Sequence, residues 1–164
     1  MKKLELRMYG LVNYQLTGIQ KGIQFGHAVV KYGQMMKKSD YYDQSKVYDK
    51  WANEYQTFII LNGGTTNINQ ISLGTLNQHL KTLNDNGIIC ADFYEPDLGD
   101  QLTAISFIVD ERVFNKKKYP DYKDNYISKI MGRNFDINYQ NWKKKIGGDK
   151  NVFLRDFLRK FNLA

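Results

Sequence analysis

The opening residues alternate between apolar and polar side chains, and the residues after them change to a helical spacing. The alternation predicts a strand over residues 4–12. The helical spacing predicts a helix over residues 18–36, with an apolar stripe that repeats every three or four positions. The stripe consists of Ile19, Ile23, Gly26 and Val30. We expect it to form the apolar face of the helix.

Hydrophobic runs separated by glycine-containing turns predict the elements that follow. The expected order is a helix over 42–55, a strand over 57–64, a helix that ends at Gly87, a strand over 88–96 and a strand over 102–110. Long helices between hydrophobic strands are typical of α/β domains, and a short connection makes the last two strands antiparallel neighbours. The sequence therefore predicts an α/β fold.

The start of the first helix carries a capping box. Thr17 is followed three positions later by Gln20. In this spacing the Thr17 hydroxyl accepts a hydrogen bond from the backbone of Gln20, and the Gln20 side chain reaches back to the backbone of Thr17. The helix is therefore expected to begin at Gly18.

Beyond Arg112 the chain becomes basic and rich in tyrosine. Residues 1–111 carry 10 Lys or Arg and 12 Asp or Glu, whereas residues 112–164 carry 14 and 5, so the net charge of +7 originates in the C-terminal third. The final segment, NVFLRDFLRKFNL, predicts a basic amphipathic helix. We expect an α/β domain over 1–112 and an extension over 113–164 that packs on that domain or on a partner subunit.

The clustered positive charge favours a polyanionic partner, most simply RNA or a nucleotide, because Lys and Arg release counterions from phosphates. Two lysine runs stand next to aromatic residues, which is typical of phosphate contacts beside stacked bases. The central lysines of these runs, Lys117 and Lys144, are predicted to bind substrate. A solvated surface explains the same charges equally well.

Composition narrows the class of protein further. No run of eighteen apolar residues occurs, so no membrane span is expected, and the lack of an apolar leader predicts a cytoplasmic protein. The single cysteine, Cys90, excludes an internal disulfide and a cysteine-based zinc cluster, and we expect it to be a buried strand thiol. The acidic residues around Pro96 favour a turn over a cation site, so no metal and no cofactor is expected.

One face of the predicted first helix carries a row of functional groups. The row consists of Gln20, Gln24, His27 and Lys31. Lys21 lies beside it, and the free backbone amides near Gly18 favour an anion. A histidine at the edge of an amphipathic helix is also common without any function, so the row alone leaves both interpretations open.

A loop and the second histidine are two further features with ligand-binding chemistry. The loop NGGTTNIN follows a strand and precedes a helix, which is where α/β folds bind ligands, but it lacks the Lys and Ser or Thr of a P-loop and is predicted to be a turn. His79 lies off the leucine stripe of its helix and is predicted to face solvent.

Two segments resemble the second type of peptidyl-tRNA hydrolase, the archaeal and eukaryotic kind with phage and bacterial relatives. GIQKGIQFGHAVVKY is similar to the Gln-x-x-His-Ala helix after that family's first strand, and ADFYEPDLGDQLTAISFIV is similar to the ending of its phage and bacterial members. The resemblance covers residues 1–112. It implies a three-layer α/β/α fold with a mixed four-stranded sheet, often a homodimer, and hydrolysis of the ester that joins a peptide to tRNA.

The resemblance also implies roles for individual residues. Family positions are matched by Gln24, His27, Ala28 and Thr103. Gln20 stands where the family has a lysine, and Lys21 is displaced by one position. His27 is expected to act as acid and base, Lys21 to stabilise developing negative charge, and Asp92 to orient His27. Thr103 completes the predicted catalytic set as a hydrogen-bonding positioner. The predicted substrate-binding residues in this half of the chain are Gly18, Gln20, Gln24 and Lys31.

Three functions follow. The first is a metal-independent hydrolase that cleaves an ester or phosphoester bond in an RNA or nucleotide substrate. The second is a phage anti-defence protein that cleaves or sequesters a cyclic nucleotide immune signal, such as a cyclic dinucleotide. The third is a non-catalytic RNA-binding adaptor, which would need the basic extension but not His27.

Overall fold

The computed structural model divides the chain into two compact units, and each is described by itself. The structure describes residues 4–69 and 71–164. The sheet unit contains residues 5–109 and, from the end of the chain, residues 161–164. The helical unit consists mainly of residues 110–160. No helix in these described stretches is long and apolar enough to cross a membrane.

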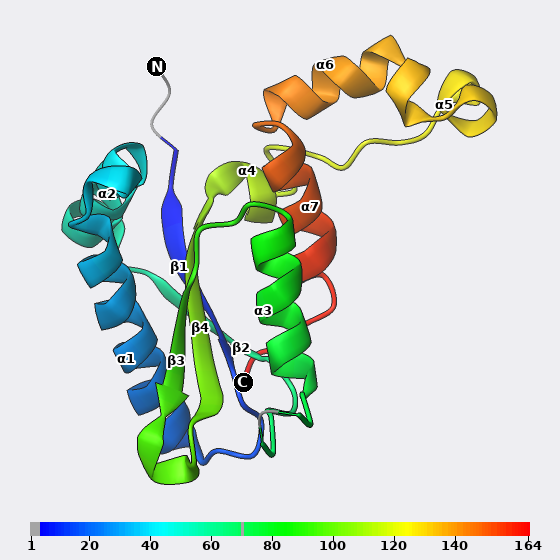
Figure 1. Ribbon diagram of the computed structural model, residues 1–164. Coiled ribbons are helices and arrows are strands. Elements are labelled where there is room, and N and C mark those ends of the chain that lie inside the picture. The colour runs from blue at the N-terminus through cyan, green and yellow to red at the C-terminus, as the bar shows by residue number, and fades with distance from the viewer. Residues whose placement is uncertain (1–3, 70) are drawn as a thin grey trace. The chain divides into compact units, whose positions relative to one another are not determined.

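A four-stranded mixed sheet forms the centre of the sheet unit, in the order β2-β1-β4-β3 (Figure 1). β1 (Leu6–Val12) pairs in parallel with β2 (Phe58–Asn62). β3 (Ala91–Glu95) pairs antiparallel with β4 (Gln101–Asp110), across a short 3-10 turn at Pro96–Leu98. The predicted α/β class and the antiparallel pairing of the last two strands are therefore confirmed.

Helix α1 (Gly18–Met36) has the predicted bounds because its capping box is formed. The Thr17 hydroxyl accepts from the backbone of Gln20 at 3.4 Å, and the Gln20 side-chain oxygen accepts from the backbone of Thr17 at 3.0 Å. Both partners lie within four residues of one another, so a purely local signal sets where the helix begins.

The face of α1 that packs on the sheet is not the predicted one. Ile19, Ile23 and Val30 are 79%, 52% and 63% exposed. The residues of α1 that are buried instead are Gln24, Phe25, Ala28, Tyr32 and Met36. Large aromatic side chains bury more area than Ile or Val, and their burial turns the isoleucine stripe toward solvent. Gly10 of β1 permits the approach, since a Cβ there would overlap the Phe25 ring.

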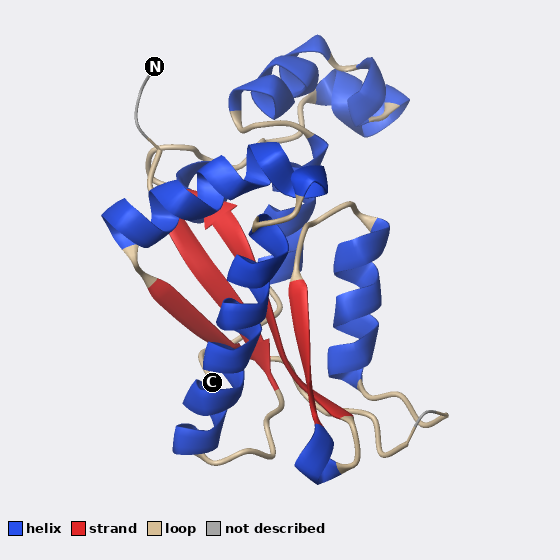
Figure 2. Cartoon of the chain, turned by 60° about the vertical axis from the view of Figure 1, so that its left-hand side comes forward, coloured by secondary structure: helices blue, strands red, loops and turns tan. Residues whose placement is uncertain are grey.

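The other helices of the sheet unit depart from the prediction at their ends. α2 (Tyr42–Lys50) follows a 3-10 turn at Ser39–Tyr41 and continues into a π-helical turn at Trp51–Tyr55, so the predicted helix over 42–55 is not α-helical throughout. α3 (Thr75–Asp85) begins later than expected, since the described residues between β2 and Thr75, 63–69 and 71–74, are not helical (Figure 2). It ends before Gly87, which takes the positive φ of 65° that a glycine adopts readily.

Both faces of the sheet carry buried side chains. Met8 of β1 belongs to a core cluster with Phe25 and Tyr32 of α1. Leu11, of opposite parity along the same strand, and Leu76 of α3 are both fully buried and both lie next to Gly63. Figure 1 draws α1 and α3 on opposite sides of the sheet.

The end of the chain covers an edge of the sheet. Leu163 forms an antiparallel bridge with Leu61 of β2. The backbone of Asn62 donates to Asn162 at 2.9 Å, and that of Ala164 donates to Ile60 at 3.0 Å. An uncovered edge strand offers unpaired backbone groups to other chains, so this tail protects β2.

The helical unit contains four α-helices within its described residues 110–160. They are α4 (Glu111–Phe114), α5 (Tyr126–Met131), α6 (Ile137–Lys145) and α7 (Asp149–Leu158), with a 3-10 turn at Arg133–Phe135. The predicted amphipathic final helix is confirmed as far as Leu158, with Leu154 and Phe157 buried. Arg155 of α7 is also buried and donates to Asp121 at 2.5 Å and to the carbonyl of Tyr119 at 2.8 Å.

Candidate functional site

Gln24 of α1 is the centre of a hydrogen-bonded junction between α1 and two strands. Its side-chain oxygen accepts from the hydroxyl of Thr103 on β4 at 2.7 Å. Its side-chain nitrogen donates to a carboxylate oxygen of Glu95 on β3 at 2.5 Å. Gln24 and Thr103 are both buried, so the junction fixes which face of α1 lies against β3 and β4.

His27 lies one turn further along the same face of α1. Its ring stacks on Phe93 of β3, with ring centroids 4.5 Å apart and an interplanar angle of 15°. The side chain is otherwise exposed, and no residue of the described chain hydrogen-bonds to either ring nitrogen. Because stacking uses the face of the imidazole, both nitrogens stay available at its edge.

Asp92 does not orient His27 as predicted. Its carboxylate accepts instead from the ammonium of Lys31 at 2.6 Å, and the two side chains are 32% and 47% exposed. Lys31 is four residues after His27 and therefore lies beside it on the helix surface. The structure thus places a partly solvated ion pair next to the imidazole. Such a pair contributes about 0 to 1 kcal/mol to stability.

The predicted catalytic pair of Lys21 and His27 is not brought together. Helical geometry places Lys21 about 120° around the axis and about 9 Å along it from His27. Lys21 is half-buried, and its side chain has no hydrogen bond or ion pair within the described part of the chain. Gln20, a predicted substrate ligand, is occupied by the capping box. Gly18 remains exposed at the start of the helix.

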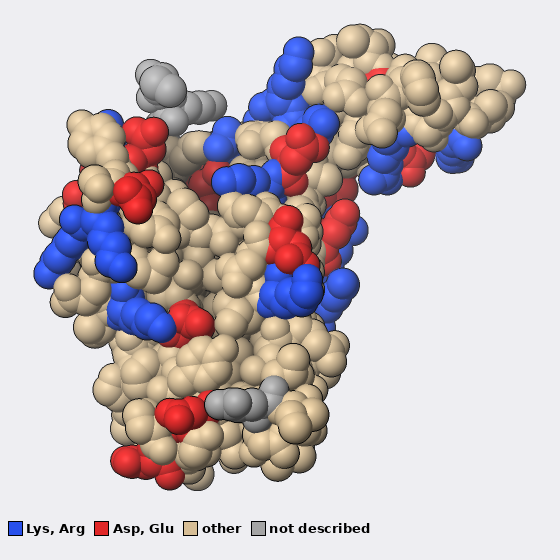
Figure 3. Space-filling view, viewed as in Figure 1, with Lys and Arg blue, Asp and Glu red and all other residues tan. Residues whose placement is uncertain are grey.

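Lys117 and Lys144, the other predicted substrate ligands, are exposed residues of the helical unit without an ion pair among the described residues. Their neighbours are compensated by carboxylates. These pairs are Lys116–Asp121, Lys118–Glu111 and Lys143–Asp149. Figure 3 shows Lys and Arg interspersed with Asp and Glu on the face drawn, rather than gathered into one patch. Part of the lysine charge in this unit is therefore paired locally, and Lys117 and Lys144 belong to the excess that is not.

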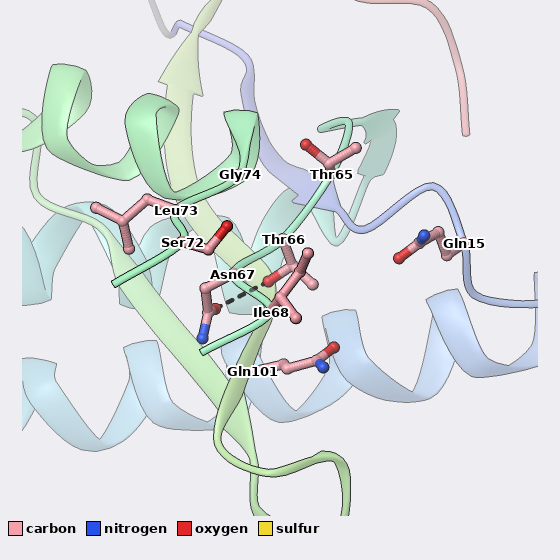
Figure 4. Close-up of a pocket in the computed structure, with 9 residues that line it drawn as sticks. All are labelled: Gln15, Thr65, Thr66, Asn67, Ile68, Ser72, Leu73, Gly74 and Gln101. Atoms are coloured by element: carbon pink, nitrogen blue, oxygen red, sulfur yellow. Dashed lines mark hydrogen bonds between the residues drawn. The ribbon is translucent and has the colours of Figure 1, made fainter. Parts of the chain in front are cut away.

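A cavity of about 260 Å³ lies at the ends of β1 and β2, beside the start of α3 (Figure 4). Its lining residues are Gln15, Thr65, Thr66, Asn67, Ile68, Ser72, Leu73, Gly74 and Gln101. The loop NGGTTNIN, predicted as a turn, contributes four of them. Sequence reasoning missed Gln15 and Gln101, which come from two other segments and carry no local motif.

Strand β4 links this cavity to the junction at Gln24. The backbone nitrogen of Leu102 donates to the side chain of Asn67 at 2.9 Å, and its carbonyl accepts from the hydroxyl of Thr66. The next residue, Thr103, donates to Gln24. Consecutive residues of one strand therefore hold the cavity wall and the helix that carries His27.

Cys90 and His79 differ from their predictions. Cys90 is half-buried and precedes β3, and its thiol donates to the side chain of Asn84 at 3.3 Å. Burial raises the pKa of this thiol to about 12. His79 is half-buried rather than fully solvated, and its ring packs edge-on against Phe161 with centroids 4.8 Å apart.

No group of three or more His, Cys, Asp or Glu side chains that could hold a metal ion occurs in the part of the chain that the structure describes. The acidic residues around Pro96 are instead distributed among separate contacts, with Glu95 on Gln24 and Asp92 on Lys31.

Comparison with known proteins gave no match, either to a protein-family model or to a curated protein.

Proposed function

We propose that the protein is a hydrolase related to the second type of peptidyl-tRNA hydrolase, and that it cleaves an ester or phosphoester bond in an RNA or nucleotide substrate. The observation that carries this proposal is the junction at Gln24. Gln24 belongs to the Gln-x-x-His-Ala segment, whereas Glu95 and Thr103 belong to the second segment of the resemblance, 71 and 79 residues away. Direct hydrogen bonds between them support a common origin for the two similarities.

The arrangement of the sheet unit supports the same proposal. A mixed sheet with α1 against one face and α3 on the other side is compatible with the three-layer α/β/α fold that the resemblance implies. The ends of β1 and β2 and the start of α1 then form the edge at which α/β folds bind ligands. His27 and the cavity both belong to this sheet unit.

In the proposed mechanism His27 is the acid and base. One ring nitrogen takes a proton from the attacking water or ribose hydroxyl, and the protonated imidazole then gives a proton to the leaving oxygen. Lys31, beside His27, is the cation nearest along the helix to meet negative charge on the acyl or phosphoryl oxygen. Gln24 and Thr103 act as positioning residues because they hold α1 on the sheet.

A second candidate is the cleavage or sequestration of a cyclic nucleotide signal, such as a cyclic dinucleotide. It is favoured by the separation of Lys21 from His27 on α1, because a changed cation position accords with a changed substrate. The two candidates use the same face of α1 and differ only in the ligand.

Product analysis distinguishes these functions. The full chain is incubated with peptidyl-tRNA and, separately, with a panel of cyclic mono- and dinucleotides, and products are separated by chromatography. Free peptide or a linear nucleotide supports a hydrolase and identifies its substrate. Tight retention of one nucleotide without product identifies a sequestering protein. Binding of long RNA with a steep salt dependence and no product would replace the proposal with the adaptor.

A further inference from the structure

The cavity beside α3 has an unusual lining for a protein expected to bind phosphates. None of the nine lining residues that the structure describes is charged. The first backbone amides of α3 are also occupied, since Thr75 donates to the Thr65 hydroxyl at 3.1 Å and Leu76 donates to the Thr65 carbonyl at 2.8 Å. The cavity therefore suits a neutral, hydrogen-bonding group rather than an anion.

Thr66 and Asn67 form the floor of the cavity, and their side chains are already hydrogen-bonded within the protein. The two residues are 7% and 6% exposed. The side-chain oxygen of Asn67 accepts from the backbone of Leu102 at 2.9 Å and from the amide of Asn77 at 3.2 Å, while the hydroxyl of Thr66 donates to the carbonyl of Leu102. Buried groups with all their partners in place are rigid, so the floor is preorganised.

The rim, in contrast, offers free hydrogen-bonding groups. The side chains of Gln15 and Gln101 have no hydrogen-bond partner within the described chain. Figure 4 shows them at the cavity, one from the loop before α1 and one from the first residue of β4. A carboxamide presents a donor and an acceptor side by side, and its natural complement is the edge of a nucleobase, as when Gln binds adenine through two hydrogen bonds.

Two apolar side chains also line the cavity. Ile68 and Leu73 are 77% and 59% exposed, although both are apolar. A flat heterocycle in the cavity would bury part of this apolar surface. The volume of about 260 Å³ lies just below the range of roughly 300 to 1,000 Å³ that holds drug-sized ligands, so it suits one ring system rather than an oligonucleotide.

We propose that this cavity binds the heterocyclic base of a nucleotide, with Gln15 and Gln101 contacting its hydrogen-bonding edge. As a substrate subsite it rests on the proposed function, since the base held here would belong to the molecule that His27 cleaves. Leu102, which donates to Asn67 at the cavity, and Thr103, which donates to Gln24 on the helix that carries His27, are adjacent residues of β4.

Nucleosides test whether the cavity binds a base, because they carry a base but no ester or phosphoester bond that the protein could cleave. Amide shifts of the ¹⁵N-labelled full chain are followed during titration with adenosine, guanosine, cytidine and uridine, and with ribose 5-phosphate as a probe that lacks a base. We expect saturable shifts at Thr66, Asn67 and Gln101 with at least one nucleoside, adenosine foremost, and none at these residues with ribose 5-phosphate. The absence of saturable shifts with all four nucleosides, or the same shifts with ribose 5-phosphate, would overturn the proposal.

A pair of variants locates the contact. Gln101→Ala keeps the backbone pairing of β4 and removes one rim amide, so nucleoside binding should weaken about tenfold, or about 1.4 kcal/mol. Gln34→Ala, an exposed glutamine near the other end of α1, should bind as the unaltered chain does. Equal affinity for both variants refutes the assigned contact. Nucleoside binding without hydrolysis of any substrate would refute the proposed function and leave the cavity assignment intact.

Discussion

Substitutions at Thr103 and Gln24 should have coupled effects on stability, because the hydrogen bond between these two side chains is buried. Thr103→Val removes the hydroxyl but keeps the shape, and it leaves the buried side-chain oxygen of Gln24 without its partner. An unsatisfied buried acceptor costs about 1 to 3 kcal/mol. Gln24→Leu has a smaller effect on Thr103, whose hydroxyl retains the carbonyl of Phe93 at 3.2 Å as an acceptor.

The double variant should therefore be less destabilised than the two single variants predict when added. Replacing both members of a buried pair by apolar groups of the same shape is nearly neutral, so we expect a coupling energy of about 1 kcal/mol. The assay is urea unfolding followed by Trp51 fluorescence. Trp51 is buried in the sheet unit, and a Trp142→Phe background removes the other tryptophan, which lies in the helical unit.

Additivity of the two changes to within about 0.5 kcal/mol would refute the reasoning, because residues without a shared contact behave in that way. The control is Gln20→Ala. It removes the N3 side chain of the capping box at the start of the same helix, and its destabilisation should add independently to that of Thr103→Val.

Three other changes test separate parts of the fold. Gly10→Ala should destabilise the sheet unit by about 1 to 3 kcal/mol in urea unfolding, because the new Cβ overlaps the Phe25 ring; unchanged stability would contradict this packing. The Cys90 thiol, whose pKa burial raises from 9.0 to about 12, should react with iodoacetamide far more slowly in the folded chain than in urea. Its raised pKa also contributes stability that is complete below pH 9 and is lost as the pH rises toward 12, so Cys90→Ala should flatten the loss of stability over that window. Deletion of residues 161–164 uncovers β2 and should increase aggregation measured by light scattering, whereas a chain that stays monodisperse would show that the tail has no protective role.

Local signals explain which elements the sequence predicted well. The capping box at Thr17 set the start of α1, and Gly87 marked the end of α3, because each signal involves residues within one turn. The face of α1 was predicted wrongly, since the spacing of Ile19, Ile23 and Val30 says nothing about competition with Phe25 for the sheet. That competition depends on Gly10, which lies in another element.

The candidate site shows the same difference between local signals, which the sequence reveals, and contacts between distant elements, which it does not. The helical spacing placed Gln24 and His27 on one face of α1, and the structure agrees. The partners of that face come from β3 and β4, and only the folded sheet shows that Glu95 and Thr103 reach Gln24 while Asp92 pairs with Lys31. Long-range pairing of this kind leaves no periodic pattern in the sequence.

The central claim, that His27 performs acid and base chemistry, is tested most directly by the single-turnover rate of His27→Ala on the substrate that the unaltered chain cleaves. His79→Ala is the matched control, because it removes the other histidine from a different helix. The account predicts a loss of about 10² to 10⁴-fold for His27→Ala at a temperature where thermal unfolding shows that the variant is still folded, and no loss for His79→Ala. A His27→Ala variant that turns over as fast as the unaltered chain would contradict it.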